Sequence, residues 1–243
     1  MPPLFPFFVT RVQDPSTKSM ALTQIQPQPL SGQIKQMLRD QIVAGVLSPG
    51  QRLTETDLAD QLSVSRGPLR EAIIQLTEEG LLEKAAYKGL RVRTVSQNEL
   101  RELYSLRTAL EQFAFQTAWS RRDDQALANL EARFDRLAKS RKDEDLTEAV
   151  DGEIDFHSWV YELSGHSLLQ SHWRRLVPLV QIYIALHQRH FGAGGVFMEA
   201  NQQYLTLAQG DSLTLMQEHI LDHMQKGLAE VIASVPDAIA ASK

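Results

Sequence analysis

The chain has 243 residues, of which 43% are hydrophobic, and this length allows two modest folded domains. It contains no cysteine, which excludes disulfides, zinc sites built on thiolates and cysteine nucleophiles. No apolar run is long enough to span a bilayer. The formal net charge is −5, but residues 23–96 carry nine Lys/Arg and eight Asp/Glu, whereas residues 97–243 carry 14 and 21. The first part can therefore present a basic face to a partner.

Residues 1–22 are expected to form a disordered tail, because they contain several prolines and show no helical periodicity. The apolar start lacks the positive leading region of a secretory signal, so we expect a cytoplasmic protein. Met20 could be the true start of translation. Residues 1–19 should then be dispensable for folding and for binding.

Three helices are predicted before residue 80. Residues 31–44 place apolar side chains every three or four positions, which is typical of an amphipathic helix. A second helix is expected to begin at Thr54, whose side chain can cap it. After a short turn, a third helix is expected between a cap at Ser65 and a stop at Gly80.

The period of the pattern changes after the third helix. Residues 81–83 and 90–93 are strand-like, and residues 87–89 form a plausible hairpin tip between them. Three helices followed by a small hairpin predict a winged helix-turn-helix, to which we assign residues 23–95.

The pattern in residues 96–236 is entirely helical. A capping box begins at Ser96, a charged loop is expected at residues 139–145, and Pro178 should kink a long helix. Two more helices should flank a stop at Gly210. The fold class is therefore mostly α, with an N-terminal winged helix-turn-helix and a C-terminal all-helical bundle.

The start of the third predicted helix has the side chains needed to contact DNA. Arg66 and Arg70 are four residues apart and share a helix face, and arginine can donate two hydrogen bonds to guanine. The Ser65 hydroxyl and the free N–H groups beside it suit a phosphate. The alternative is a solvated helix face without a partner. Lys88 and Arg91 on the hairpin could follow the DNA backbone or enter a minor groove, and Arg52 could add a phosphate contact.

The residues of this motif also carry a resemblance to a known family. Residues 58–73, LADQLSVSRGPLREAI, resemble the signature of the GntR family of bacterial regulators, as do IVAGVLSPGQRL at 42–53 and LTEEGLLE at 76–83. The rest of the chain resembles the FCD-type effector domain, through looser motifs over nearly all of residues 97–235. The resemblance implies a homodimer that binds a palindromic operator, acts as a repressor and responds to a small organic acid.

The resemblance also implies which residues meet DNA. The positions that contact bases and phosphates in the family correspond to Ser65, Arg66, Gly67, Arg70 and, on the wing, Gly89. Many members carry an arginine where this chain has Thr56. The operator preference of relatives therefore does not transfer to this chain.

Many FCD-type domains bind a divalent metal, such as Zn, Ni or Mn, through one Asp and three His. Glu153 and His157 occupy the first two ligand positions, four residues apart on one helix face. The second His is expected shortly before Tyr204, but residues 199–202 contain no histidine, and the last His is either His219 or His223. Because one ligand is missing, we favour hydrogen-bonded histidines over a tight metal site.

The same resemblance outlines an effector pocket. Arg107 matches a family arginine that faces the pocket and can pair with a carboxylate; the alternative is a helical pair with Glu111. The signal should reach the DNA-binding part through residues 92–96. The expected effector-binding residues are Arg107, His157, Tyr161, His219 and His223.

Two other classes of function compete with this interpretation. A metal-dependent hydrolase could use Glu153, His157 and His219 to activate water. A helical scaffold could use the first domain to bind protein. Neither explains the basic face at the start of the third predicted helix.

Overall fold

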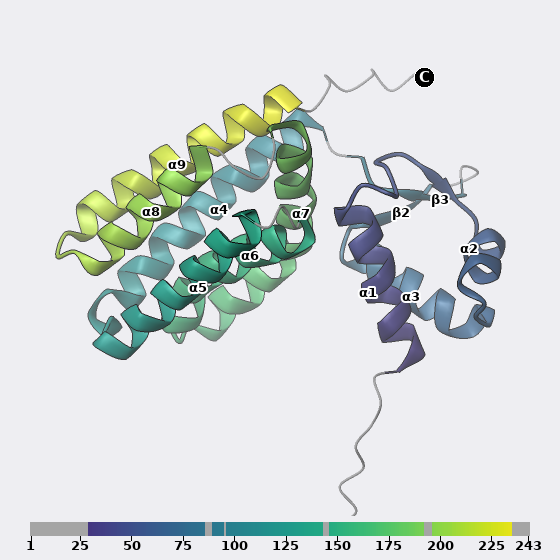
Figure 1. Cartoon of the computed structure of the whole chain (residues 1–243), viewed down its shortest axis with the longest axis horizontal. Coiled ribbons are helices and arrows are strands. Elements are labelled where there is room, and N and C mark those ends of the chain that lie inside the picture. Colours follow the sequence, from purple (N-terminus) through teal and green to yellow (C-terminus); the bar gives the residue numbers. More distant parts are fainter. Residues whose placement is uncertain (1–28, 86–88, 95, 143–145, 192–195, 235–243) are drawn as a thin grey trace, which may run out of the picture.

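The computed structural model describes residues 29–85, 89–94, 96–142, 146–191 and 196–234. Figure 1 shows two parts side by side, an N-terminal part that runs from α1 to β3 and a helical bundle that runs from α4 to α9. The predicted tail and residues 87 and 88 of the predicted hairpin tip, including Lys88, lie outside the described residues.

The N-terminal part is a winged helix-turn-helix, as predicted. The helices α2 and α3 form the motif, and Ser63 makes the turn between them with a left-handed φ of 52°. Apolar side chains from all three helices meet in one core that includes Leu38, Leu58 and Ile73. Its elements are α1 (Leu30–Val43), β1 (Arg52–Leu53), α2 (Glu55–Leu62), α3 (Arg66–Glu78), β2 (Leu82–Ala85) and β3 (Gly89–Val92).

The two predicted caps of this motif have different outcomes. The Thr54 hydroxyl accepts a hydrogen bond from the backbone N–H of Asp57 at 3.1 Å and caps α2 as expected. Ser65 stands before α3, but its side chain makes no capping hydrogen bond, so that expectation is wrong. The exposed Ser65 hydroxyl is thus not committed to its own helix.

The wing is a three-stranded antiparallel sheet with the strand order β1-β3-β2. The sequence analysis predicted β2 and β3 but not β1, which has only two residues and no pattern of its own. Arg52 on β1 lies opposite Arg91 on β3. Two residues that were predicted to contact DNA thus lie on neighbouring strands.

The rest of the described chain forms the helical bundle. The predicted capping box is present, because the Glu99 N–H donates to Ser96 Oγ and the Ser96 N–H donates to the Glu99 carboxylate. None of the described helices combines the length and the low polarity that a membrane crossing needs. The helices are α4 (Gln97–Ala118), η1 (Trp119–Arg121, a 3₁₀ turn), α5 (Asp124–Lys142), α6 (Leu146–Leu163), α7 (Ser167–Phe191), α8 (Val196–Gln209) and α9 (Leu213–Ser234).

One predicted loop is wrong. Residues 139–142 belong to α5, which ends only at Lys142. The charged composition suggested solvent, but Arg141 is buried and pairs with Glu153 on α6. Residues 139–142 contain no apolar side chain, and α5 is held there against α6 by the Arg141–Glu153 ion pair.

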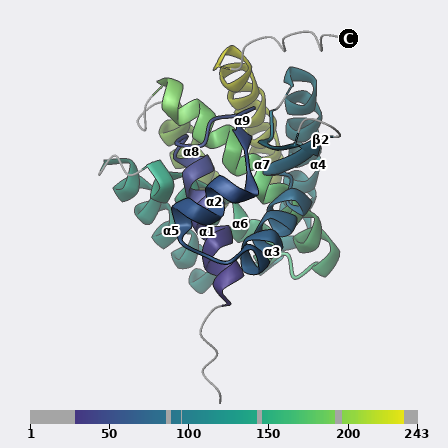
Figure 2. The same cartoon turned by 90° about the vertical axis from the view of Figure 1, so that its right-hand side faces the viewer.

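The N-terminal part packs directly on α6 and α7 of the bundle. Figure 2, seen from the side of the N-terminal part, shows its helices in front of the bundle. Ile182 of α7 is buried in the core of the N-terminal part, and Val43 of α1 packs against Val150 of α6. Arg39 of α1 donates to the Gln181 side chain at 2.8 Å. The two parts thus share an interface in addition to their covalent connection.

Candidate nucleic-acid interface and buried ligand site

The start of α3 presents polar side chains to solvent. Arg66, Gly67 and Arg70 are exposed, whereas Leu69 and Ile73 between and beyond them are completely buried. This division follows from the helical period, which turns one face to the core and the other outward. The first backbone N–H groups of α3 have no partner within the helix and can meet a phosphate.

Arg70 has a partner on α2. Its Nε donates to the Glu55 carboxylate at 2.7 Å, and this hydrogen bond lowers the pKa of Glu55. The Arg70 side chain is 58% exposed, so the pair contributes only about 0.2–1 kcal/mol to stability. Such a weak pair can hold the guanidinium in place and still release it to a stronger acceptor.

The wing supplies further positive charge near the same place. Lys84 on β2 and Arg66 on α3 both help to lower the pKa of Glu55, so their charges lie close to the start of α2. The sequence analysis did not select Lys84, because a lone lysine in a short strand carries no distinctive signal. Gly89 has a φ of +76°, and a Cβ placed there would lie 3.7 Å from Arg52 Nε.

The bundle contains a narrow cavity lined by charged and polar side chains. Its volume is about 10 Å³, which is room for at most one water molecule. An organic ligand must therefore move neighbouring side chains as it enters. The lining residues are Tyr104, Arg107, Arg141, Glu153, Ile184, His187, Gln188, His223 and Val231.

Glu153 is the most heavily hydrogen-bonded group at this cavity. Arg141 Nη2 donates to its Oε2 at 2.8 Å, and the Asn201 amide lies 3.0 and 2.9 Å from its two oxygens. His157 Nε2 lies 3.3 Å from Oε1. Burial alone would raise the pKa of Glu153, but the His157 hydrogen bond and the Arg141 charge hold it well below its ordinary value.

Glu111 is a second buried carboxylate in contact with His157. His157 Nδ1 lies 2.8 Å from Glu111 Oε1, and Arg107 Nε lies 3.5 Å from Oε2. Burial opposes ionisation, yet the neighbouring positive charges lower the pKa of Glu111 to about 2. Burial likewise opposes a charge on His157, but the Glu111 carboxylate raises its pKa. His157 is thus held between two carboxylates.

The two candidate histidines of α9 differ in their surroundings. The His223 ring stacks on His157 at 5.4 Å, and burial, followed by the His157 charge, lowers its pKa to about 3. The His219 ring lies 5.8 Å from that of His223, and its Nε2 lies 3.0 Å from the carbonyl oxygen of Ala200. His223 therefore lies against the buried cluster formed by Glu111, Glu153 and His157, and His219 lies beyond His223.

Three of the four predicted metal ligands lie together. One donor atom each from Glu153, His157 and His223 falls within 4.8 Å of the others, and these donor types can hold a divalent metal ion. His219 is not a member of this group. Asn201 contacts Glu153 from α8, the helix where the sequence analysis found no histidine.

The predicted effector-binding residues are only partly at the cavity. Arg107 and His223 line it, but His157, Tyr161 and His219 do not. The Tyr161 ring instead stacks on Trp173 at 4.5 Å. Arg107 fulfils both interpretations from the sequence, since it lines the cavity and also pairs with Glu111 along α4.

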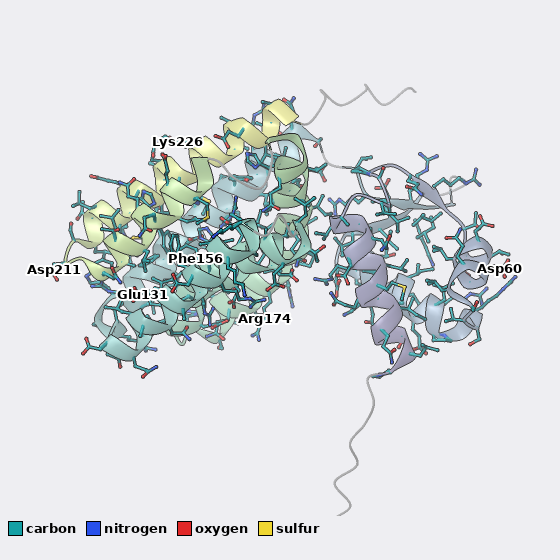
Figure 3. All side chains as sticks on the ribbon, in the orientation of Figure 1. Asp60, Glu131, Phe156, Arg174, Asp211 and Lys226 are labelled. Carbon is teal, nitrogen blue, oxygen red and sulfur yellow. The ribbon has the colours of Figure 1, made fainter. Side chains whose placement is uncertain are left out.

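Four residues of this region were missed by the sequence analysis. Arg141 was placed in a loop, Asn201 lies in the stretch where a histidine was expected and not found, and Glu111 was considered only as the alternative partner of Arg107. Gln188 lines the cavity at 1% exposure and carries no signal in the sequence. The cluster lies inside the bundle, as Phe156 of α6 does in Figure 3, whereas Asp60 of α2 lies at the far end of the N-terminal part.

Comparison with known proteins gives two family matches. Residues 30–92 match the profile of the bacterial regulatory proteins, gntR family, and residues 102–226 match the FCD domain. The chain is 50% identical over 82 residues to the Nta operon transcriptional regulator of Aminobacter aminovorans, covering 34% of this chain and 39% of that protein. It is 30% identical over 152 residues to the gluconate operon transcriptional repressor of Bacillus subtilis, covering 63% of this chain and 62% of that protein.

Solved structures show a similar fold. A putative GntR transcriptional regulator from Rhodococcus sp. RHA1 superposes with a TM-score of 0.71 at 23% identity, covering 85% of this chain and 99% of the other. McbR/YncC of Escherichia coli gives a TM-score of 0.69 at 23% identity and covers 84% and 97%. These likenesses extend over both parts of the molecule.

Proposed function

Because this chain belongs to the GntR family of transcription regulators and contains an FCD domain, we propose that it is an operator-binding repressor whose affinity for DNA is set by a small organic acid in the bundle. Residues 23–95 would form the DNA-binding domain, residues 96–236 the effector domain and residues 1–22 a tail. The gluconate operon relatives are repressors, and operator binding implies a cytoplasmic location.

The exposed start of α3 carries the DNA-binding part of the proposal. Arg66 and Arg70 would contact base edges, and Ser65 and Gly67 would let the DNA backbone approach the helix end. The remaining phosphate contacts would come from the wing. They are Arg52, Lys88, Gly89 and Arg91.

A homodimer would place two such helices on a two-fold axis and match a palindromic operator. Support comes from α4, where Leu106 and Phe113 are seven residues apart on one face and are 48% and 45% exposed. Large apolar side chains at this spacing suit a helix contact between copies. Light scattering should give the mass of a dimer, and Phe113→Glu should shift it toward the monomer. A monomeric parent, with and without DNA, would rule this assembly out.

The direct interface between the two parts supports the coupling. Ile184 and Gln188 of α7 line the cavity, and Ile182 on the same helix is buried in the core of the DNA-binding part. On α6, Glu153 lines the cavity and Val150 packs against α1. An acid that shifts α6 or α7 would thus move the docking surface directly, in addition to acting through residues 92–96. The acid regulates DNA binding only if it has different affinities for the DNA-binding conformation of the protein and for the conformation that does not bind DNA.

The hydrolase alternative is not retained. The family consists of transcription regulators and not of enzymes. In addition, His219 does not join Glu153 and His157 in a common ligand group.

The proposal is tested by selecting operator duplexes from a random pool with the purified chain. Specific retention of a palindromic sequence, with affinity that falls as salt rises, is expected. Small organic acids should release the selected duplex. Failure to enrich any sequence would contradict the proposal, whatever the cavity binds.

A further inference from the structure

Glu153 already has protein cations and donors around it. Arg141 reaches its Oε2 at 2.8 Å, and both side chains are 5% exposed, so the pair is part of the core. Asn201 points its amide nitrogen at both carboxylate oxygens. The oxygen pair that a metal ion would need is thus engaged by two other helices.

The positive charges already beside the carboxylates disfavour a divalent cation. Arg107 and Arg141 provide two positive charges, and Glu111 and Glu153 provide two negative ones. A divalent ion bound to Glu153 would lie close to the Arg141 guanidinium, and two positive charges close together in a site shielded from water repel each other strongly. If Asn201 turned its amide to offer an oxygen to the ion, its donation to Glu153 would be lost.

The cavity beside the cluster holds donors that still lack a partner. Neither amide atom of Gln188 makes a hydrogen bond within the described residues, although the side chain is 1% exposed. Arg107 Nη2 is also without a hydrogen bond there. A buried polar atom without a partner destabilises the protein, so a ligand that satisfies it gains affinity.

We propose that Arg141 replaces the metal in this chain, and that a short monocarboxylate binds the donors of Arg107 and Gln188 directly, with no metal bridge. This inference rests on the proposed function, since it names the class of acid that would act on the same site. Ile184 and Val231 give the cavity its apolar walls, which suit a short hydrocarbon tail. The narrow cavity favours an acid of a few carbon atoms.

The metal half is tested on the purified full chain by elemental analysis and by thermal unfolding with ZnCl₂, NiCl₂ or MnCl₂ alone. The expected result is no stoichiometric metal and no rise of the melting temperature. One retained equivalent per chain, or a rise that EDTA reverses, would overturn the proposal. The double variant Arg141→Leu/Asn201→His restores a fourth ligand and removes the competing cation, and it should gain a response to Zn²⁺.

The ligand half uses straight monocarboxylates from formate to butyrate, each with and without EDTA, and acetamide as a neutral match for acetate. At least one acid should raise the melting temperature and acetamide should not. Gln188→Leu should weaken the binding of that acid at least about tenfold, whereas Gln203→Leu on the exposed face of α8 should leave its binding unchanged. No response of the parent to any acid, or a response that EDTA abolishes, would overturn it. Selection of an operator does not depend on either result, so the two proposals fail separately.

Discussion

Arginine serves opposite purposes in the two parts of this molecule. On α3, Arg70 is 58% exposed and holds one weak pair, which water or a phosphate can replace. In the bundle, the Arg141 side chain is 5% exposed and faces a carboxylate that has equally little access to water. The exposed arginine is available to a changing partner, whereas the buried one is a permanent counter-charge. The same type of side chain is therefore free to change partners at the surface and fixed in one ion pair inside the bundle, because the two sites differ in their access to water.

The largest effect should come from removing the buried counter-charge. Arg141→Met leaves Glu153 buried without its ion pair and should lower the free energy of unfolding by about 3–5 kcal/mol. Arg136→Met, which removes exposed pairs on the same helix, should cost about 1 kcal/mol or less. Urea unfolding followed by tryptophan fluorescence measures both, because all three tryptophans lie in the bundle. Equal costs would remove the contrast between buried and exposed pairs.

A smaller effect, on binding and not on folding, is expected at α3. Arg66→Ala and Arg70→Ala should each weaken specific operator binding by about 1–3 kcal/mol if the arginines contact bases. Their unfolding free energies should stay within about 0.5 kcal/mol of the parent. Fluorescence anisotropy at one fixed salt concentration compares them with Arg101→Ala on the exposed face of α4. Operator binding by both variants at the parent's affinity would show that another surface reads the DNA.

Acid should destabilise the bundle through its buried neutral histidine. The pKa of His223 is about 3 in the folded state and 6.5 ordinarily, so the unfolded chain binds the proton first. Stability is therefore complete above pH 6.5 and falls below it, by about 2 kcal/mol at pH 5. The raised pKa of His157 acts in the opposite direction, because the stability that it contributes is complete only well below pH 6.5 and is lost as the pH rises.

The matching variant is His223→Gln, which removes this titration. Urea unfolding at pH 7.5 and pH 5 should show a smaller loss for the variant than for the parent. The lowered pKa values of His187 and His219 act in the same direction and remain in both proteins. The same loss in the two proteins would mean that His223 is not buried in its neutral form.

The smallest effect is expected at a glycine on the exposed face of α3. A Cβ added to Gly67 or to Gly32 meets nothing within 4 Å, so alanine at either position should stabilise its helix by up to about 1 kcal/mol. Only Gly67→Ala should also weaken operator binding, because only that position would lie against the DNA backbone. Thermal unfolding and anisotropy on both variants separate the effects. Unchanged operator binding by Gly67→Ala would place the DNA away from this helix end.

The sequence by itself determined the features that depend on neighbours along the chain. The caps at Thr54 and Ser96 and the exposed arginines of α3 follow from hydrogen bonds and periodicities within a few residues. The pair Glu153 and His157 was found for the same reason, since one helical turn joins them. The long match of residues 58–73 to a family signature reinforced these local signals.

Only the tertiary structure decided what surrounds that pair. Glu111 meets His157 across 46 positions of sequence, and Asn201 meets Glu153 across 48. Arg141 looked like part of a solvated loop, and its burial follows from the packing of α5 on α6. Charges inside a protein are set by which helices exclude water around them, and a linear pattern of polar residues does not contain that information. The exposed face of α3 could therefore be predicted, whereas the charged groups around the cavity could not.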